Sequence, residues 1–344
     1  MAKKHWEKTA PELLERRLLD QYPDLTEQTA RMLGVKLEEA WPDWCYLPMG
    51  AAFSIASQGA ERSIALRFAL NDTDFAETYR ALAAIIPWRL YKCVYRFDSD
   101  LAAELMELSV EPDNVPTEVL LHMPYPCVFI ADPPGIDGCI GVFFFWDWDG
   151  RHPDSMELRQ HYLFSDGTVE AAFIVIGSKA DNIFAQEYAE DVELQEAVSS
   201  TGQDAFLRGL RRARATDRHI QIQQNSMKHL NLLLYLCSDE PDITEKGSEP
   251  VRKGKTVQVA AYTHPYEVGN YVGSVIRKAR ANPDPLNESA GGTSSTKRPH
   301  MRRAHWHTYW YGSNRDEPRV KWLSPIFVHG AALNDTPVVI HPVR

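Results

Sequence analysis

The feature that most constrains the fold is a stretch in which β-forming segments alternate with short turns. Segments rich in Val, Ile, Phe, Tyr and Trp occupy residues 117–131, 139–148, 157–164 and 168–176. The breaks between them, "DPPGIDG", "DGRHPD" and "SDG", carry Pro or Gly. Neighbouring parallel strands need crossovers of about twelve residues or more, and these gaps are too short to hold them. The sequence therefore predicts an antiparallel meander.

Helical patterns flank this meander on both sides. "TAPE" at 9–12 offers a capping box, and apolar residues from Phe75 to Ile86 recur at helical spacing until Pro87. Helical periodicity returns at about 185–238 and again at 266–280. The prediction is an α+β protein with an N-terminal helical region, a central antiparallel β-sheet with packed helices, and a C-terminal strand unit.

Changes in composition suggest where these regions begin and end. Residues 282–299 are rich in Pro, Gly, Ser and Thr, which is typical of a linker or loop. We expect the C-terminal strand unit that follows it to pack on the central sheet. The predicted regions are 1–112 (helical), 113–281 (α+β), 282–299 (linker) and 300–344 (strand unit).

Charge and cysteine content exclude several classes of protein. With 37 basic and 47 acidic residues the net charge is −10, which argues against a protein that coats nucleic acid with its whole surface. Five cysteines without a C-x-x-C pair favour a reducing compartment, and the charged N-terminus is unlike a signal peptide. No nucleotide or cofactor motif is present. We expect a cytoplasmic protein without cofactor or membrane span.

The segment "KRPHMRRAHWHTYWYG", residues 297–312, concentrates basic, histidine and aromatic side chains in an otherwise acidic chain. Carboxylates are absent from Ser289 to Arg315. If the segment is extended, its side chains alternate between two faces. One face would carry His305, His307, Tyr309 and Tyr311, and the other Trp306, Thr308 and Trp310.

Four interpretations of this segment follow from its residues. Trp306, Trp310 and the later Trp322 could anchor strands in a core. A metal site would combine His300 with the H-x-H pair, but the missing carboxylates argue against it, and we predict no metal. A ribonuclease could use His305 and His307 as acid and base, with Arg302 stabilising the transition state. Basic and aromatic side chains could instead bind phosphates, bases or a peptide.

Four segments resemble the second type V-A anti-CRISPR family, which is found on bacterial mobile genetic elements. They are "RPHMRRAHWHTYW" at 298–310, "RVKWLSPIFV" at 319–328, "LLLYLCSDEPDITEKG" at 232–247 and "VPTEVLLHMPYPCVFIA" at 115–131. The resemblance implies suppression of the production of the type V-A Cas effector nuclease. The inhibitor would recognise the effector's N-terminal polypeptide on the ribosome, and the effector mRNA would be lost in a translation-dependent way, by its own action or through a host nuclease.

Under this resemblance the segment belongs to a binding protein rather than an enzyme. The hypothesis assigns peptide or RNA binding to Lys297, Arg298, His300, Arg302, Arg303, His305, His307 and Tyr309, and structural anchoring to Trp306, Trp310 and Trp322. A ribonuclease that uses His305, His307 and Arg302 remains an alternative. An RNA-binding regulator without a peptide partner is the other.

Overall fold

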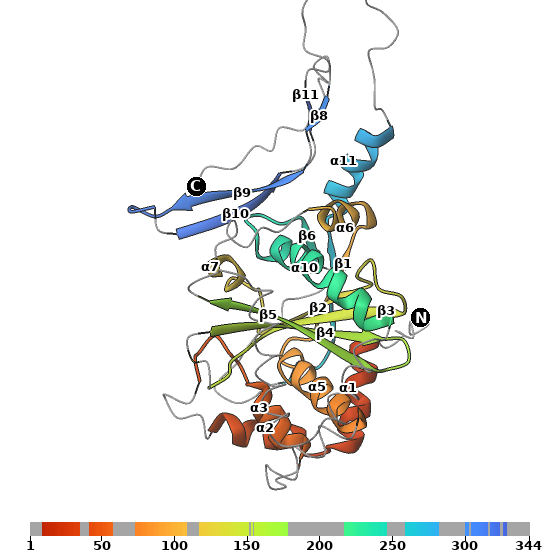
Figure 1. Ribbon diagram of the computed structural model, residues 1–344, viewed down its shortest axis with the longest axis vertical. Coiled ribbons are helices and arrows are strands. Elements are labelled where there is room, and N and C mark those ends of the chain that lie inside the picture. Colours follow the sequence, from red (N-terminus) through yellow and green to blue (C-terminus); the bar gives the residue numbers. More distant parts are fainter. Residues whose placement is uncertain are drawn as a thin grey trace, which may run out of the picture.

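The centre of the molecule is a seven-stranded β-sheet with helices on both faces (Figure 1). The computed structural model describes residues 9–34, 41–57, 73–108, 117–150, 153, 155–177, 217–245, 259–281, 300–302, 304–315, 317–323 and 326–328. The mixture of helices and a mainly antiparallel sheet confirms the predicted α+β class.

The sheet has the strand order β5-β4-β3-β2-β1-β7-β6. Its strands are β1 Cys93–Phe97, β2 Cys127–Ala131, β3 Cys139–Asp147, β4 Ser155–Phe164, β5 Val169–Gly177, β6 Ile243–Glu245 and β7 His264–Val268. Strands β2 to β5 form the predicted antiparallel meander. The expected strand 117–131 is shorter than predicted, because Thr117–Leu120 form a helical turn, α7.

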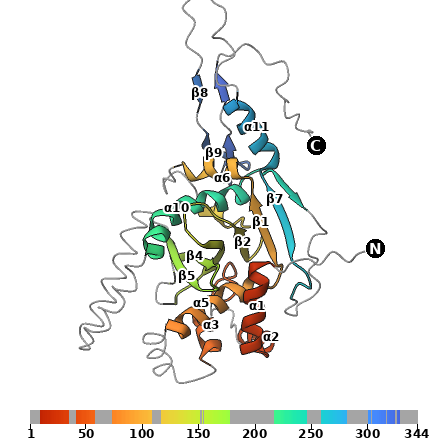
Figure 2. The ribbon, with the colours of Figure 1, turned by 90° about the vertical axis from the view of Figure 1, so that its right-hand side faces the viewer.

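Strand β1 lies between two parallel neighbours, β2 and β7, and the sequence did not predict it (Figure 2). Tyr95 is opposite Ile130 on one side and Tyr266 on the other. The expected helical region 1–112 therefore also supplies a strand to the sheet. Parallel pairing with β7 joins residues far apart in the chain, and local periodicity carries no signal of such a contact.

Among the described residues, four helices from the N-terminal region cover one face of the sheet (Figure 1). They are α1 Ala10–Gln21, α2 Leu25–Gly34, α3 Met49–Ala56 and α5 Thr73–Trp88. The predicted capping box of α1 is present, with the Thr9 amide donating to Oε2 of Glu12 at 2.7 Å. Helix α5 extends just past Pro87, and its Leu82 and Ile85 are fully buried.

The opposite face is covered by α6 Ser99–Met106 and α10 Asp217–Cys237, with α11 Asn270–Ala281 packed against α6. Strand β3 explains why two helical layers form, because both its faces are apolar. Phe143 lies in the core on the side of α5, and Phe144 lies in the core on the side of α10. Within the described residues, no helix combines the length and apolar character needed to cross a bilayer.

The C-terminal strands form two small sheets separate from the central one. Strand β8, His300–Arg302, pairs with β11, Ile326–Val328. Strand β9, His305–Tyr311, pairs with β10, Glu317–Leu323, as an antiparallel hairpin. We expected this unit to pack on the central sheet, but α10 lies between the hairpin and the sheet (Figure 1).

Candidate functional site

The β9–β10 hairpin has two chemically different faces, as the alternation in the sequence predicts. Its register pairs Trp306 with Trp322 and Thr308 with Val320 on one face, the inner face, which is directed toward α10. The other face, here called the outer face, carries His307, Tyr309, Tyr311, Glu317, Arg319 and Lys321. His305 belongs to the same side by register and is half-buried.

The inner face is anchored on α10 by aromatic and polar contacts. Trp322 is 8% exposed, and its ring makes an edge-to-face contact with Tyr235 at a centroid distance of 5.9 Å. The half-buried Trp306 donates its indole N–H to Oδ1 of Asn231 at 2.8 Å. Both tryptophans thus contact α10 from the inner face of the hairpin.

Trp310 differs from the expected anchoring role. Its side chain is 55% exposed, although it shares the inner-face register with Trp306 and lies opposite Pro318. Figure 1 shows the tip of the hairpin extending beyond α10. Trp310 is therefore an exposed aromatic side chain near the hairpin tip.

The outer face presents exposed aromatic rings that are ordered by their neighbours. Tyr309 and Tyr311 are 36% and 40% exposed. The ring of His307 meets Tyr309 edge-to-face at 4.4 Å, and the guanidinium of Arg319 lies 4.6 Å from the centre of the Tyr311 ring. Such contacts limit side-chain freedom before a ligand arrives, which lowers the entropic cost of binding.

Two cations of the outer face are paired with carboxylates from the loop after α10. Arg319 lies 3.8 Å from Asp239, and Lys321 lies 3.2 Å from Glu240. The same loop bonds to the hairpin backbone, with the Asp239 amide donating to the Val320 carbonyl at 2.7 Å. The outer face therefore contains aromatic rings and near-balanced charge.

The other predicted site residues are placed only in part. His300 and Arg302 lie in β8, and the structure describes their backbone but not their side chains. Lys297, Arg298 and Arg303 lie outside the described residues. The structure thus brings His307 and Tyr309 together on one face and leaves the remaining basic side chains unassigned.

Residues 231–242 contact the hairpin at several points, and sequence reasoning did not assign them to the site. Asn231, Tyr235, Asp239 and Glu240 each touch β9 or β10. Burial raises the pKa of Tyr235 to about 12, so its hydroxyl stays protonated where the Asp242 amide donates to it at 3.3 Å. Polar residues inside a leucine-rich helix, followed by three carboxylates in "SDEPD", were the available signal.

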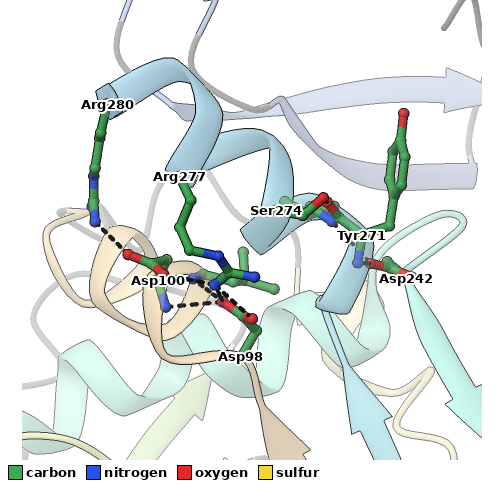
Figure 3. Close-up of polar contacts among 9 residues, drawn as sticks. Asp98, Asp100, Asp242, Tyr271, Ser274, Arg277 and Arg280 are labelled. Carbon is green, nitrogen blue, oxygen red and sulfur yellow. Dashed lines mark hydrogen bonds and ion pairs between the residues drawn. The ribbon is translucent and has the colours of Figure 1, made fainter. Parts of the chain in front are cut away.

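Asp242 also fixes the start of α11. Its Oδ2 accepts the amides of Tyr271 at 2.8 Å and Val272 at 3.1 Å, which caps the helix from a distant segment (Figure 3). Further along α11, Arg277 bonds to Asp98 and Asp100. These contacts join α11 to α6 and to the loop that supports the hairpin.

Gly273 lets α11 approach α6 closely. A Cβ at this position would lie 2.0 Å from Oδ1 of Asp98. That carboxylate cannot move freely, because it caps α6 through the Asp100 amide at 3.0 Å and holds Arg277 at 2.9 Å. Helix α11 therefore depends on a glycine at this contact.

The strand end "FFFWDWDG", residues 143–150, combines aromatic and acidic side chains, and its Asp147 serves the core. Asp147 is 3% exposed, accepts the Met49 amide at 2.8 Å and pairs with Arg159 at 2.9 Å. Arg159 is also paired with Glu157. Asp147 thus fixes the start of α3 and is covered. Within the described residues, no group of three or more His, Cys, Asp or Glu side chains is arranged to hold a metal.

Comparison with known proteins agrees with the sequence resemblance. Residues 95–330 match the model of the anti-CRISPR type V subtype A2 family, described as AcrVA2-like. The fold is similar to the crystal structure of AcrVA2, with a TM-score of 0.61 and 18% identity over 94% of this chain and all of that one. No curated protein sequence matches. Because the family match spans most of the chain, this protein is a member of the anti-CRISPR type V subtype A2 family.

Proposed function

We propose that this protein suppresses production of a type V-A Cas effector nuclease by recognising the effector's nascent N-terminal polypeptide. Effector mRNA would then be lost in a translation-dependent way, in the cytoplasm and at the ribosome. The observation that carries the proposal is the outer face of the hairpin, where exposed tyrosine rings lie beside cations that are already paired with carboxylates.

The charge of the outer face favours a peptide over RNA as its ligand. Phosphate binding draws its affinity from cations that are free to replace counterions. Arg319 and Lys321 instead face Asp239 and Glu240, and the whole chain carries −10. A phosphate backbone would meet these carboxylates as well as the cations. A polypeptide of mixed charge would not be repelled in this way.

The aromatic side chains fit peptide recognition equally well. Tyrosine offers a large, amphipathic contact area with few torsions to order, and it is enriched at protein interfaces. Tyr309, Trp310 and Tyr311 follow one another along β9 and are all at least 36% exposed. Alternation places Trp310 on the other face of the hairpin from the two tyrosines, so a peptide that passes the strand can contact aromatic rings on both faces.

The proposal is tested by separating the effector's RNA sequence from its encoded peptide. One reporter carries the effector's N-terminal codons replaced throughout by synonyms, which changes the RNA and keeps the peptide. A second carries paired, compensating frameshifts, which keep the RNA almost intact and change the peptide. In a coupled translation extract with the inhibitor, we expect loss of the first mRNA and survival of the second.

The reverse pattern would mean that the protein reads RNA and would refute the proposal. Purified inhibitor and effector transcript, mixed without ribosomes, form the control arm. Cleavage there that disappears in His305→Ala would establish the ribonuclease mechanism instead. Transcript loss that needs translation and also needs added cell extract would indicate that a host nuclease is recruited.

A further inference from the structure

We infer that Asn231 is a positioning residue for β9. By holding β9 in place it also positions His307 and Tyr309, which lie on the outer face. The link to ligand binding rests on the proposed function. Asn231 is fully buried in α10, within a run whose neighbours Leu230, Leu232 and Leu233 are apolar. A polar side chain in such surroundings requires partners for both ends of its amide.

The two partners of Asn231 come from different parts of the fold. Its Nδ2 donates to the Leu108 carbonyl, just beyond the end of α6, at 3.1 Å. Its Oδ1 accepts the indole N–H of Trp306 in β9 at 2.8 Å. One side chain thus connects α6, α10 and the hairpin.

The chemistry of these partners allows only one orientation of the amide. A backbone carbonyl only accepts hydrogen bonds, and an indole N–H only donates them. Flipping the amide of Asn231 would therefore set oxygen against oxygen at Leu108 and N–H against N–H at Trp306. Neither Asp nor Leu can form this pair of bonds. The fixed orientation of the Asn231 amide therefore determines where the indole N–H of Trp306 must lie.

Asn231 holds a different strand of the hairpin from the one held by Tyr235 and Asp239. The ring contact of Tyr235 with Trp322, and the bond from the Asp239 amide to Val320, both reach β10. The Asn231 bond reaches β9, one residue before His307. Removing it leaves the β10 attachments in place and frees the β9 side of the hairpin to rotate about them.

Helix α10 offers a matched control in Asn225. It is also a buried asparagine, 8% exposed, and its Nδ2 donates to a backbone carbonyl, that of Gly135, at 2.9 Å. Gly135 lies in the loop between β2 and β3, whereas Asn231 reaches the hairpin. Asn225→Leu and Asn231→Leu remove the same chemical group from the same helix.

The first measurement needs no ligand. Nuclear magnetic resonance of the full chain, with the indole N–H of Trp306 assigned through Trp306→Phe, reports exchange of that proton with solvent. We expect faster exchange and a shifted resonance in Asn231→Leu and no change in Asn225→Leu. Continued protection of the indole proton in Asn231→Leu would overturn the inference.

The second measurement is calorimetric titration with a synthetic peptide of the effector's N-terminal residues, below the unfolding temperature of every variant. Asn231→Leu should weaken binding about tenfold, the amount set by one buried hydrogen bond. Asn225→Leu should leave the affinity unchanged. Trp306→Phe should weaken binding like Asn231→Leu, and the double variant should be no worse than either, because both remove one bond.

Equal effects of Asn225→Leu and Asn231→Leu on affinity, or additive effects in the double variant, would show a merely structural role and overturn the inference. If Asn231→Leu does not fold, Trp306→Phe tests the same bond from the half-buried side. Absence of peptide binding by the wild-type protein would refute the proposed function, and the indole exchange would still decide whether Asn231 positions β9.

Discussion

His229 of α10 and Tyr162 of β4 form a buried contact across the interface between helix and sheet, with the imidazole Nδ1 3.1 Å from the hydroxyl oxygen. Nε2 of the same ring lies 2.8 Å from the Pro134 carbonyl, to which its N–H donates. Burial lowers the pKa of His229 from 6.5 to about 4, so the ring is neutral at pH 7.

This contact predicts acid sensitivity. The unfolded chain takes up a proton near pH 6.5 and the folded chain only near pH 4, so the stability present above pH 6.5 declines as the pH falls through that window. We expect a loss of roughly 3 kcal/mol between pH 7 and pH 4 from this residue. Urea unfolding at both pH values measures it.

His161, whose pKa burial lowers to about 3, adds a loss in the same direction. The exposed His122 provides the control, since His122→Gln should keep the acid sensitivity of the wild type, and His229→Gln should reduce it. An unfolding free energy that is flat from pH 7 to pH 4 would contradict this account of both buried histidines.

Truncating two tryptophans of the hairpin should change the unfolding free energy by very different amounts. Trp322 is 8% exposed against Tyr235, so Trp322→Ala should cost about 3 kcal/mol of unfolding free energy. Trp310 is 55% exposed, and Trp310→Ala should stay within about 0.5 kcal/mol of the wild type. Chemical unfolding of both variants compares them. Equal losses would mean that Trp310 is anchored after all.

Side chains of the outer face should contribute to peptide affinity and contribute little to the stability of the fold. Tyr309→Ala and His307→Ala should each weaken binding of the effector's N-terminal peptide by about tenfold, as loss of an interface aromatic does. Thermal unfolding temperatures should not change. Tyr262→Ala removes a tyrosine that is 78% exposed elsewhere and should leave binding intact. If all three variants bind alike, the peptide contacts another surface.

Two glycines in helices should behave in opposite ways when replaced by alanine. In Gly273→Ala the new methyl group would meet Asp98 at 2.0 Å, so α11 must shift from α6, at a cost of about 1–3 kcal/mol. Gly50 in α3 has open space at its Cβ, and Gly50→Ala should stabilise by about 0.5–1 kcal/mol through helix propensity. Differential scanning calorimetry of both variants should show a lower unfolding temperature for Gly273→Ala and a higher one for Gly50→Ala.

Local patterns predicted the parts of the fold that local forces determine. The meander from β2 to β5, the capping box at Thr9 and the helix at 73–88 follow from alternation, turn residues and apolar spacing. Strands β6 and β7 were missed for physical reasons. β6 has three residues, and β7 carries Pro265, which weakens a strand pattern.

For the candidate site, alternation predicted the two faces of β9 and could not predict what each face meets. Trp310 shares the inner-face register of Trp306 and is nevertheless 55% exposed, because exposure depends on tertiary packing and not on alternation alone. Asn231 and Asp242 act on residues that follow them by 75 and 29 positions. Contacts of this kind leave no periodic mark in the sequence.

The parallel pairing of β1 with β7 has a consequence for the protein's own synthesis. During translation, residues 93–97 emerge long before residues 264–268, so one side of β1 stays an open edge while roughly half of the chain is made. Closing the sheet also requires an unfavourable long loop, which slows folding. A protein proposed to act on growing polypeptides thus has an unpaired strand during part of its own synthesis. During that time chaperone binding and aggregation compete with folding.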